Sequence, residues 1–167
     1  NELRLALVQG RGLAIKDKNL LSKGGSSDPF VKFEVTGGDY AAKPFKSSIK
    51  KKTLQPVWRE IFQVPLKQDA EQDNPVVDVT VYDHDEATSP DFMGSCAINV
   101  EELKATKKAA RVWHALLPEE GKSDNVTGDV EIIAQWWYNP ALDFDPFLEP
   151  DDHPDEAPNE LRVALVA

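Results

Sequence analysis

Apolar and polar residues alternate with a period of two along most of this chain of 167 residues. Leu3, Leu5 and Leu7 occupy every second position, and the valines of residues 77–81 alternate with Asp78 and Thr80. Successive side chains of a strand point to opposite faces, so this period is typical of strands with one buried face. Segments of this kind occupy residues 3–9, 30–35, 57–62, 77–81, 96–100, 111–117 and 129–138. The pattern predicts an all-β fold, an antiparallel β-sandwich of about eight strands.

One short segment departs from the period of two. Asn99 is suited to cap a helix, and Glu101 and Glu102 would then lie in the first turn, where acidic side chains are favourable. A single cysteine, Cys96, excludes an internal disulfide and fits a reducing compartment. Because small residues adjoin it, we expect Cys96 to fill space in the core rather than to act as a nucleophile.

The C-terminal part of the chain differs in composition from the rest. Residues 139–158 contain five prolines, seven acids and no Lys or Arg, which predicts an extended linker. Residues 159–166 then nearly repeat residues 1–8. We therefore expect one complete domain at 1–138, an acidic proline-rich linker at 139–158, and the first strand of a following repeat at 159–167.

Three carboxylates lie close together in sequence after the strand at 77–81. Asp83 and Asp85 share a face if the strand continues, and the turn at Thr88-Ser89-Pro90 would bring Asp91 towards them. At about 5 Å and an effective dielectric constant of about 20, each pair of such charges costs about 3 kcal/mol. Calcium, which takes six to eight oxygen ligands, would relieve this repulsion. The alternative is a solvated acidic loop.

Four segments, in this order, resemble sequence motifs of the C2 domain, a calcium-dependent lipid-binding β-sandwich. They are Ser27-Asp28-Pro29-Phe30-Val31-Lys32, Thr53-Leu54-Gln55-Pro56-Val57-Trp58-Arg59-Glu60, Val81-Tyr82-Asp83-His84-Asp85 with Asp91, and Phe92-Met93-Gly94. The resemblance covers residues 1 to about 138. It implies the permuted (type II) form of the fold, with residues 3–9 as the first strand and 129–138 as the last. The alternative is that 129–138 opens the next domain.

The resemblance also implies a calcium site between two loops at one end of the sandwich. Carried over by position, the ligands are the carboxylates of Asp17, Asp28, Asp83, Asp85 and Asp91 and the main-chain carbonyl of His84. The first loop is longer here than in the common form of the family, which makes Asp17 the ligand that is hardest to assign. Bound calcium would attract the phosphate and carboxylate groups of an anionic phospholipid membrane.

Two further groups of residues are assigned by the same resemblance. Leu20 and Leu21 in the long first loop would insert into the membrane interface, contributing on the order of 1–2 kcal/mol each; the alternative is that they pack under their own loop. Lys46, Lys50, Lys51 and Lys52 resemble a basic strand region that binds phosphoinositides in part of the family. If residues 50–52 form a strand, Lys50 and Lys52 share one face. The alternative is a solvated edge strand whose lysines prevent it from pairing with another chain.

The expected function is therefore a calcium-dependent module that targets its parent protein to anionic membranes. We expect a cytoplasmic protein, peripheral at the cytosolic face of a membrane, with no nucleic-acid partner and no catalytic residues. No Ser/His/Asp set has a recognisable spacing, and no glycine-rich phosphate loop is present. Two alternatives are a calcium-independent domain that binds protein partners and the targeting arm of a larger enzyme.

Overall fold

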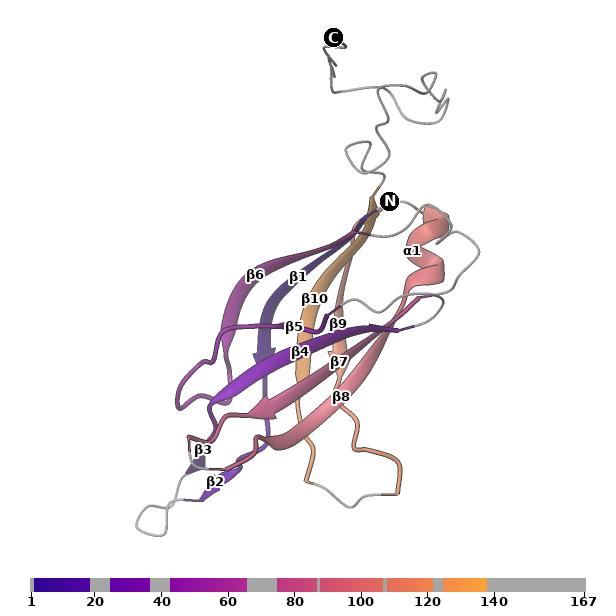
Figure 1. The fold of residues 1–167 in the computed structure, drawn as a ribbon. Helices are drawn as coiled ribbons and strands as arrows, with labels where there is room; N and C mark the ends of the chain where they lie inside the picture. The colour runs from indigo at the N-terminus through magenta and orange to yellow at the C-terminus, as the bar shows by residue number, and fades with distance from the viewer. Residues whose placement is uncertain are drawn as a thin grey trace, which may run out of the picture.

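The computed structural model describes residues 2–18, 25–36, 43–65, 75–86, 88–106, 108–121 and 125–137. Two four-stranded antiparallel sheets pack face to face (Figure 1). The first sheet has the order β6-β1-β10-β9, with β6 at Val57–Pro65, β1 at Glu2–Arg11, β10 at Asp129–Trp137 and β9 at Ala110–Ala115. The second has the order β5-β4-β7-β8, with β5 at Phe45–Lys46, β4 at Pro29–Thr36, β7 at Val76–Asp83 and β8 at Asp91–Asn99. The predicted β-sandwich is confirmed.

The core consists of the apolar positions of the period-two pattern. Leu3, Leu5 and Leu7 of β1 and the alternate valines of β7 are completely buried. Phe33 of β4 packs on Phe62 of β6 with ring centroids 5.1 Å apart, which joins the two sheets. Each such side chain stabilises the fold by roughly 1.5–3 kcal/mol when fully buried. The alternation therefore sets which face of every strand points inward.

The last strand, β10, completes the sheet that the first strand begins. It pairs antiparallel with β1, from Glu2 opposite Trp137 to Arg11 opposite Asp129. The assignment of this strand to the present domain is therefore confirmed. Trp136 lies in the core, whereas Trp137 lies half-buried on the outer face beneath the guanidinium of Arg4, 4.5 Å from the ring centroid.

The departure from the strand pattern near Asn99 is a helix, α1, at Val100–Thr106. The Glu101 N–H donates to Asn99 Oδ1 at 2.9 Å, so Asn99 caps the helix as expected. No helix in the described part of the chain is long and apolar enough to cross a membrane. Cys96 packs against the core, and burial raises the pKa of its thiol to about 12. At neutral pH the thiol is therefore protonated and a poor nucleophile.

One group of connections lies at the end of the sandwich opposite the start of β1 and the end of β10 (Figure 1). The connections from β1 to β4, β5 to β6, β7 to β8 and β9 to β10 meet at one end, and the start of β1 and the end of β10 lie at the other. A short two-stranded ribbon, β2 (Asp17–Lys18) with β3 (Gly25–Ser26), belongs to the first connection. The predicted linker at 139–158 and repeat at 159–167 lie outside the described residues.

Candidate functional site

The strand β7 ends at Asp83, whose side chain is only 1% exposed at the loop end of the sandwich. The backbone N–H of Asp28 donates to Asp83 Oδ1 at 2.5 Å, and the N–H of His84 donates to the carbonyl of Asp28 at 3.1 Å. Asp28 precedes β4, which pairs with β7 so that Pro29 lies opposite Asp83. Strand pairing thus places the first and third loops side by side.

The charges around Asp83 oppose its ionisation. Burial is the largest cause that raises the pKa of this carboxyl above its ordinary value, and the negative charges of Asp17, Asp28 and Asp85 raise it further. The hydrogen bond from the Asp28 N–H acts in the opposite direction. A buried carboxylate among like charges gains from a nearby cation, which offsets both the burial and the repulsion.

The other predicted ligands surround Asp83 without converging on one point. Asp85 is half-buried and accepts a hydrogen bond from Thr88 Oγ1 at 2.8 Å. Asp91 pairs with Asp83 across β7 and β8 and is exposed, and Asp17 pairs with Ser26 in the ribbon. Within the described residues, no group of three or more His, Cys, Asp or Glu side chains is arranged to hold a metal ion. The assignment of calcium ligands stays a prediction.

Ser27 anchors the first loop beside this site. It is completely buried, its Oγ accepts from the N–H of Lys16 at 3.0 Å, and it donates to the carbonyl of Ala14 at 3.0 Å. A buried hydroxyl with both functions satisfied holds the two sides of the loop together. Leu20 and Leu21 of the same loop lie outside the described residues.

The lysine-rich stretch is not the strand that the sequence suggested. β5 ends at Lys46, and Lys51 and Lys52 form a turn, with Lys52 in the left-handed region at φ 55°. The expectation that Lys50 and Lys52 share a strand face is therefore wrong. This stretch forms hydrogen bonds to the start of β4 instead, and the N–H of Lys52 donates to Asp28 Oδ1 at 2.7 Å.

The four predicted basic residues consequently lie in different surroundings. Lys50 Nζ is 3.9 Å from Glu60, and Lys51 Nζ is 3.7 Å from Glu86 in the third loop. Lys46 is exposed, and its Nζ lies 5.9 Å from the centroid of the Phe30 ring. Lys52 is also exposed. The structure therefore brings Lys51 and Lys52 close to the acidic loops and Lys50 close to β6, while Lys46 lies on β5.

An aromatic row across three strands was not foreseen from the sequence. Phe30 stacks on Tyr82 with centroids 5.6 Å apart, and Tyr82 meets Phe92 edge-on at 6.4 Å. The row lies on the outer face of the second sheet, next to the acidic loops. The sequence does contain a signal for this row, because each of the three aromatic residues lies within two positions of a predicted calcium ligand. Phe30 is buried and Tyr82 and Phe92 are half-buried, so the row packs aromatic side chains beside the acidic loops.

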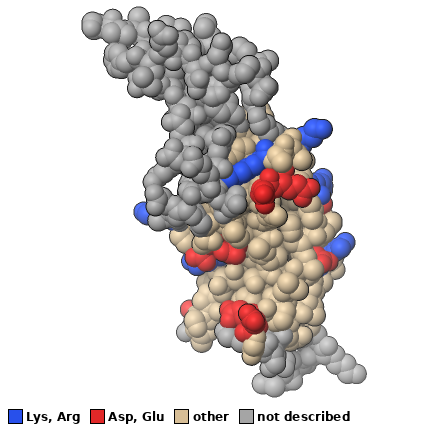
Figure 2. Space-filling model, turned by 90° about the vertical axis from the view of Figure 1, so that its right-hand side faces the viewer, with Lys and Arg blue, Asp and Glu red and all other residues tan. Residues whose placement is uncertain are grey.

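Figure 2 views the molecule from the right-hand side of Figure 1. Charged side chains stand in separate small groups on a broad uncharged surface, and those nearest the loop end on this face are acidic. The charge distribution seen there agrees with an acidic loop end.

The chain is similar to several known proteins. The model of the C2 domain family matches residues 1–116. The chain is 32% identical over 130 residues to mouse (Mus musculus) Ras GTPase-activating protein 4, covering 78% of this chain and 14% of that protein. It is 34% identical over 136 residues to the multiple C2 and transmembrane domain-containing protein of Drosophila melanogaster, covering 81% of this chain and 13% of the relative.

These curated relatives are much longer than this chain, which spans about one seventh of each. Among solved structures, a calcium-bound pair of C2 domains from Extended-Synaptotagmin 2 superposes with a TM-score of 0.63 at 23% identity, covering 81% of this chain and 45% of that one. That likeness supports the sandwich fold described above. The matched family model, the two relatives and the shared fold agree, and the chain belongs to the C2 domain family.

Proposed function

We propose that this chain is a calcium-dependent module that binds anionic membrane surfaces. The observation that carries the proposal is the buried Asp83, whose pKa is raised by burial and by the charges of Asp17, Asp28 and Asp85. A cation-free arrangement of this kind is unfavourable, and calcium is the hard cation that carboxylate oxygens prefer. The loops that carry these residues also lie at one end of the sandwich, where they can meet a flat surface.

The ligands would be the carboxylates of Asp17, Asp28, Asp83, Asp85 and Asp91 and the carbonyl of His84. All are oxygen donors, which fits calcium and not zinc. The free carboxylate oxygens would have to turn towards one another, since Asp85 now accepts from Thr88. Bound calcium supplies positive charge and open coordination positions for the phosphate or carboxylate oxygens of lipid headgroups.

The similar proteins give this proposal a biological setting. One relative is a multiple C2 and transmembrane domain-containing protein, and one solved structure of the same fold is described as calcium bound. Membrane targeting in this chain would be peripheral and on the cytosolic face, with Leu20 and Leu21 as inserting residues. The segment at 159–167 would begin a second module of the same kind, joined by the acidic linker at 139–158.

Co-sedimentation with liposomes tests the proposal. The chain should sediment with vesicles that contain phosphatidylserine only when calcium is present, and neutral vesicles or a chelator should abolish sedimentation. Asp83→Asn with Asp85→Asn should remove the calcium effect, whereas Glu102→Gln on the distant helix α1 should preserve it. Unchanged lipid binding by the double variant would refute the calcium switch.

A second candidate is calcium-independent binding of phosphoinositides by Lys46, Lys50, Lys51 and Lys52. The exposure of Lys46 beside the Phe30 ring and the exposure of Lys52 favour it. Each lysine near an anionic bilayer contributes about 1 kcal/mol. Vesicles containing phosphoinositide should then bind without calcium, and Lys46→Ala with Lys52→Ala should weaken that binding. Lys50 would contribute less, because Glu60 lies beside its ammonium group.

A further inference from the structure

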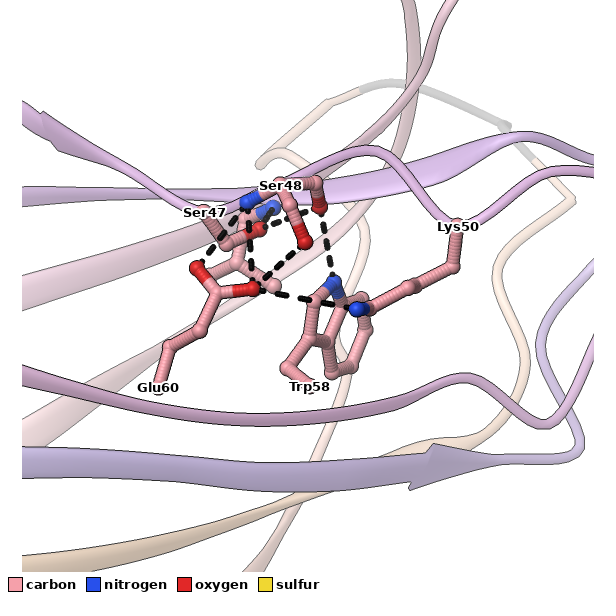
Figure 3. Close-up of polar contacts among 6 residues, drawn as sticks. Ser47, Ser48, Lys50, Trp58 and Glu60 are labelled. Carbon is pink, nitrogen blue, oxygen red and sulfur yellow. Dashed lines mark hydrogen bonds and ion pairs between the residues drawn. The ribbon is translucent and has the colours of Figure 1, made fainter.

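Two sets of hydrogen bonds hold the lysine-rich segment, one to β6 at Ser48 and one to the first loop and the start of β4 at residues 50–53. The first set begins at Glu60, whose carboxylate accepts from the N–H of Ser48 at 3.0 Å and from its Oγ–H at 2.5 Å (Figure 3). Trp58, two positions earlier, donates from Nε1 to the carbonyl of Ser48 at 3.0 Å. Both side chains reach across from β6 to fix one residue of the neighbouring segment.

The segment after Ser48 is then held along the start of β4. The N–H of Lys50 donates to the carbonyl of Pro29 at 3.0 Å, and the N–H of Thr53 donates to the carbonyl of Ser27 at 2.9 Å. Between them, the N–H of Lys52 donates to Asp28 Oδ1 at 2.7 Å. The turn therefore reaches the carboxylate of a predicted calcium ligand directly.

Lys52 needs support to make this contact. Its φ of 55° lies in the left-handed region, which side chains other than glycine avoid. Such a conformation persists only where the surrounding contacts determine it. Thr53 supplies one fixed point on the C-terminal side, and Ser48, held by Glu60 and Trp58, supplies the other on the N-terminal side.

We propose that Glu60 is a positioning residue for the cation site, acting through Ser48 and the turn at 50–52 to hold the Lys52 amide on the carboxylate of Asp28. The inference rests on the proposed function, because it assigns Asp28 to a calcium site. The amide fixes one oxygen of Asp28, so the other oxygen is presented in one orientation. Groups that orient the ligands of a metal in this way typically change its affinity by 10- to 100-fold. Glu60 itself does not coordinate the calcium ion in this proposal.

The test compares calcium affinity and backbone protection in the 167-residue chain. Calcium dissociation constants would be measured by isothermal titration calorimetry for wild type, Glu60→Ala and Glu60→Gln. Amide hydrogen exchange at Lys52 would be measured by NMR without calcium. Glu60→Ala should raise the dissociation constant about tenfold and speed exchange at Lys52. Glu60→Gln keeps an acceptor for Ser48 and should stay within about threefold of wild type, as should the control Glu102→Ala on α1.

Trp58→Phe provides a second variant that keeps an aromatic ring in the core and removes only the donor to Ser48. It should also raise the dissociation constant and speed exchange at Lys52. Wild-type calcium affinity in Glu60→Ala, or lost affinity with the Lys52 amide still protected, would overturn the positioning role alone. A wild-type chain with no calcium affinity would refute the proposed function, and the positioning role with it.

Discussion

The backbone N–H of Asp28 donates a hydrogen bond to Oδ1 of the buried Asp83, 2.5 Å away. Asp28 also contributes a negative charge that raises the pKa of Asp83, so the same residue both supports and opposes the ionised carboxylate. Burial and the neighbouring negative charges outweigh this hydrogen bond, so the pKa of Asp83 is raised overall. The ionised form of Asp83 is thus disfavoured in the folded chain, and this has measurable consequences.

Replacing Asp83 by Asn should stabilise the chain when calcium is chelated. Asn retains an oxygen that can accept the hydrogen bond from the Asp28 N–H. It also removes a negative charge that is repelled by the neighbouring carboxylates. One like-charge pair a few ångströms apart costs about 1 kcal/mol even in a water-like dielectric. Urea denaturation with a chelator present should show a free energy of unfolding about 1 kcal/mol higher than wild type. A lower value would mean that Asp83 is stabilising without calcium.

The stability of the calcium-free chain should fall as the pH rises through the folded-state pKa of Asp83. That pKa lies above the ordinary value, so the folded state holds this proton more tightly than the unfolded state does. Protonation of Asp83 contributes its full stabilisation below the pKa that this carboxyl has in the unfolded chain. The contribution is lost as the pH rises through the pKa of Asp83 in the folded chain. Denaturation at several pH values from about 4 to 7 checks this. Asp83→Asn should lack this component of the pH dependence.

The strained backbone at Lys52 predicts an unusual preference for glycine. Lys52→Gly should be more stable than Lys52→Ala by about 1 kcal/mol, because alanine has a Cβ that opposes a φ of 55°. Comparing the two variants with each other removes the effect of the lost lysine charge. Thermal denaturation of both would measure the difference, and equal stabilities would mean that the turn adopts a different conformation in solution.

Leu5 and Ile61 form a matched pair for testing the core. Leu5 is completely buried in β1, whereas Ile61 of the adjacent β6 is 72% exposed. Leu5→Ala should lower the free energy of unfolding by about 2–5 kcal/mol, and Ile61→Ala should change it by about 0.5 kcal/mol or less. Chemical denaturation of the two variants provides the comparison. Similar losses at both positions would contradict the assigned faces of the first sheet.

Much of the fold could be predicted because the period of two is a local property. It placed Leu3, Leu5 and Leu7 on the buried face of β1, and the cap at Asn99 likewise depends only on adjacent residues. The role of residues 129–138 as the last strand required one further argument, namely that the first strand needs a partner. The pairing of β10 with β1 confirms it.

The lysine turn could not be predicted in the same way. Its sequence is compatible with an edge strand, and its conformation depends on partners far along the chain, such as Asp28 for Lys52 and Glu60 for Ser48. Contacts of this kind leave no periodic signal. The proximity of Asp28, Asp83 and Asp85 follows from the family resemblance. The orientation of their carboxylates depends on donors such as Thr88, which the sequence pattern does not indicate.

The length of the sandwich separates the loops that carry the predicted ligands from the start of β1 and the end of β10. β10 is nine residues long and so spans about 30 Å, which approximates the length of the sandwich between its two ends. β1 begins at Glu2 and β10 ends at Trp137, both at the end of the sandwich opposite the loops that carry Asp28 and Asp83. If the loops bind a surface, the sandwich would hold whatever is joined to these two strand ends about 30 Å from that surface.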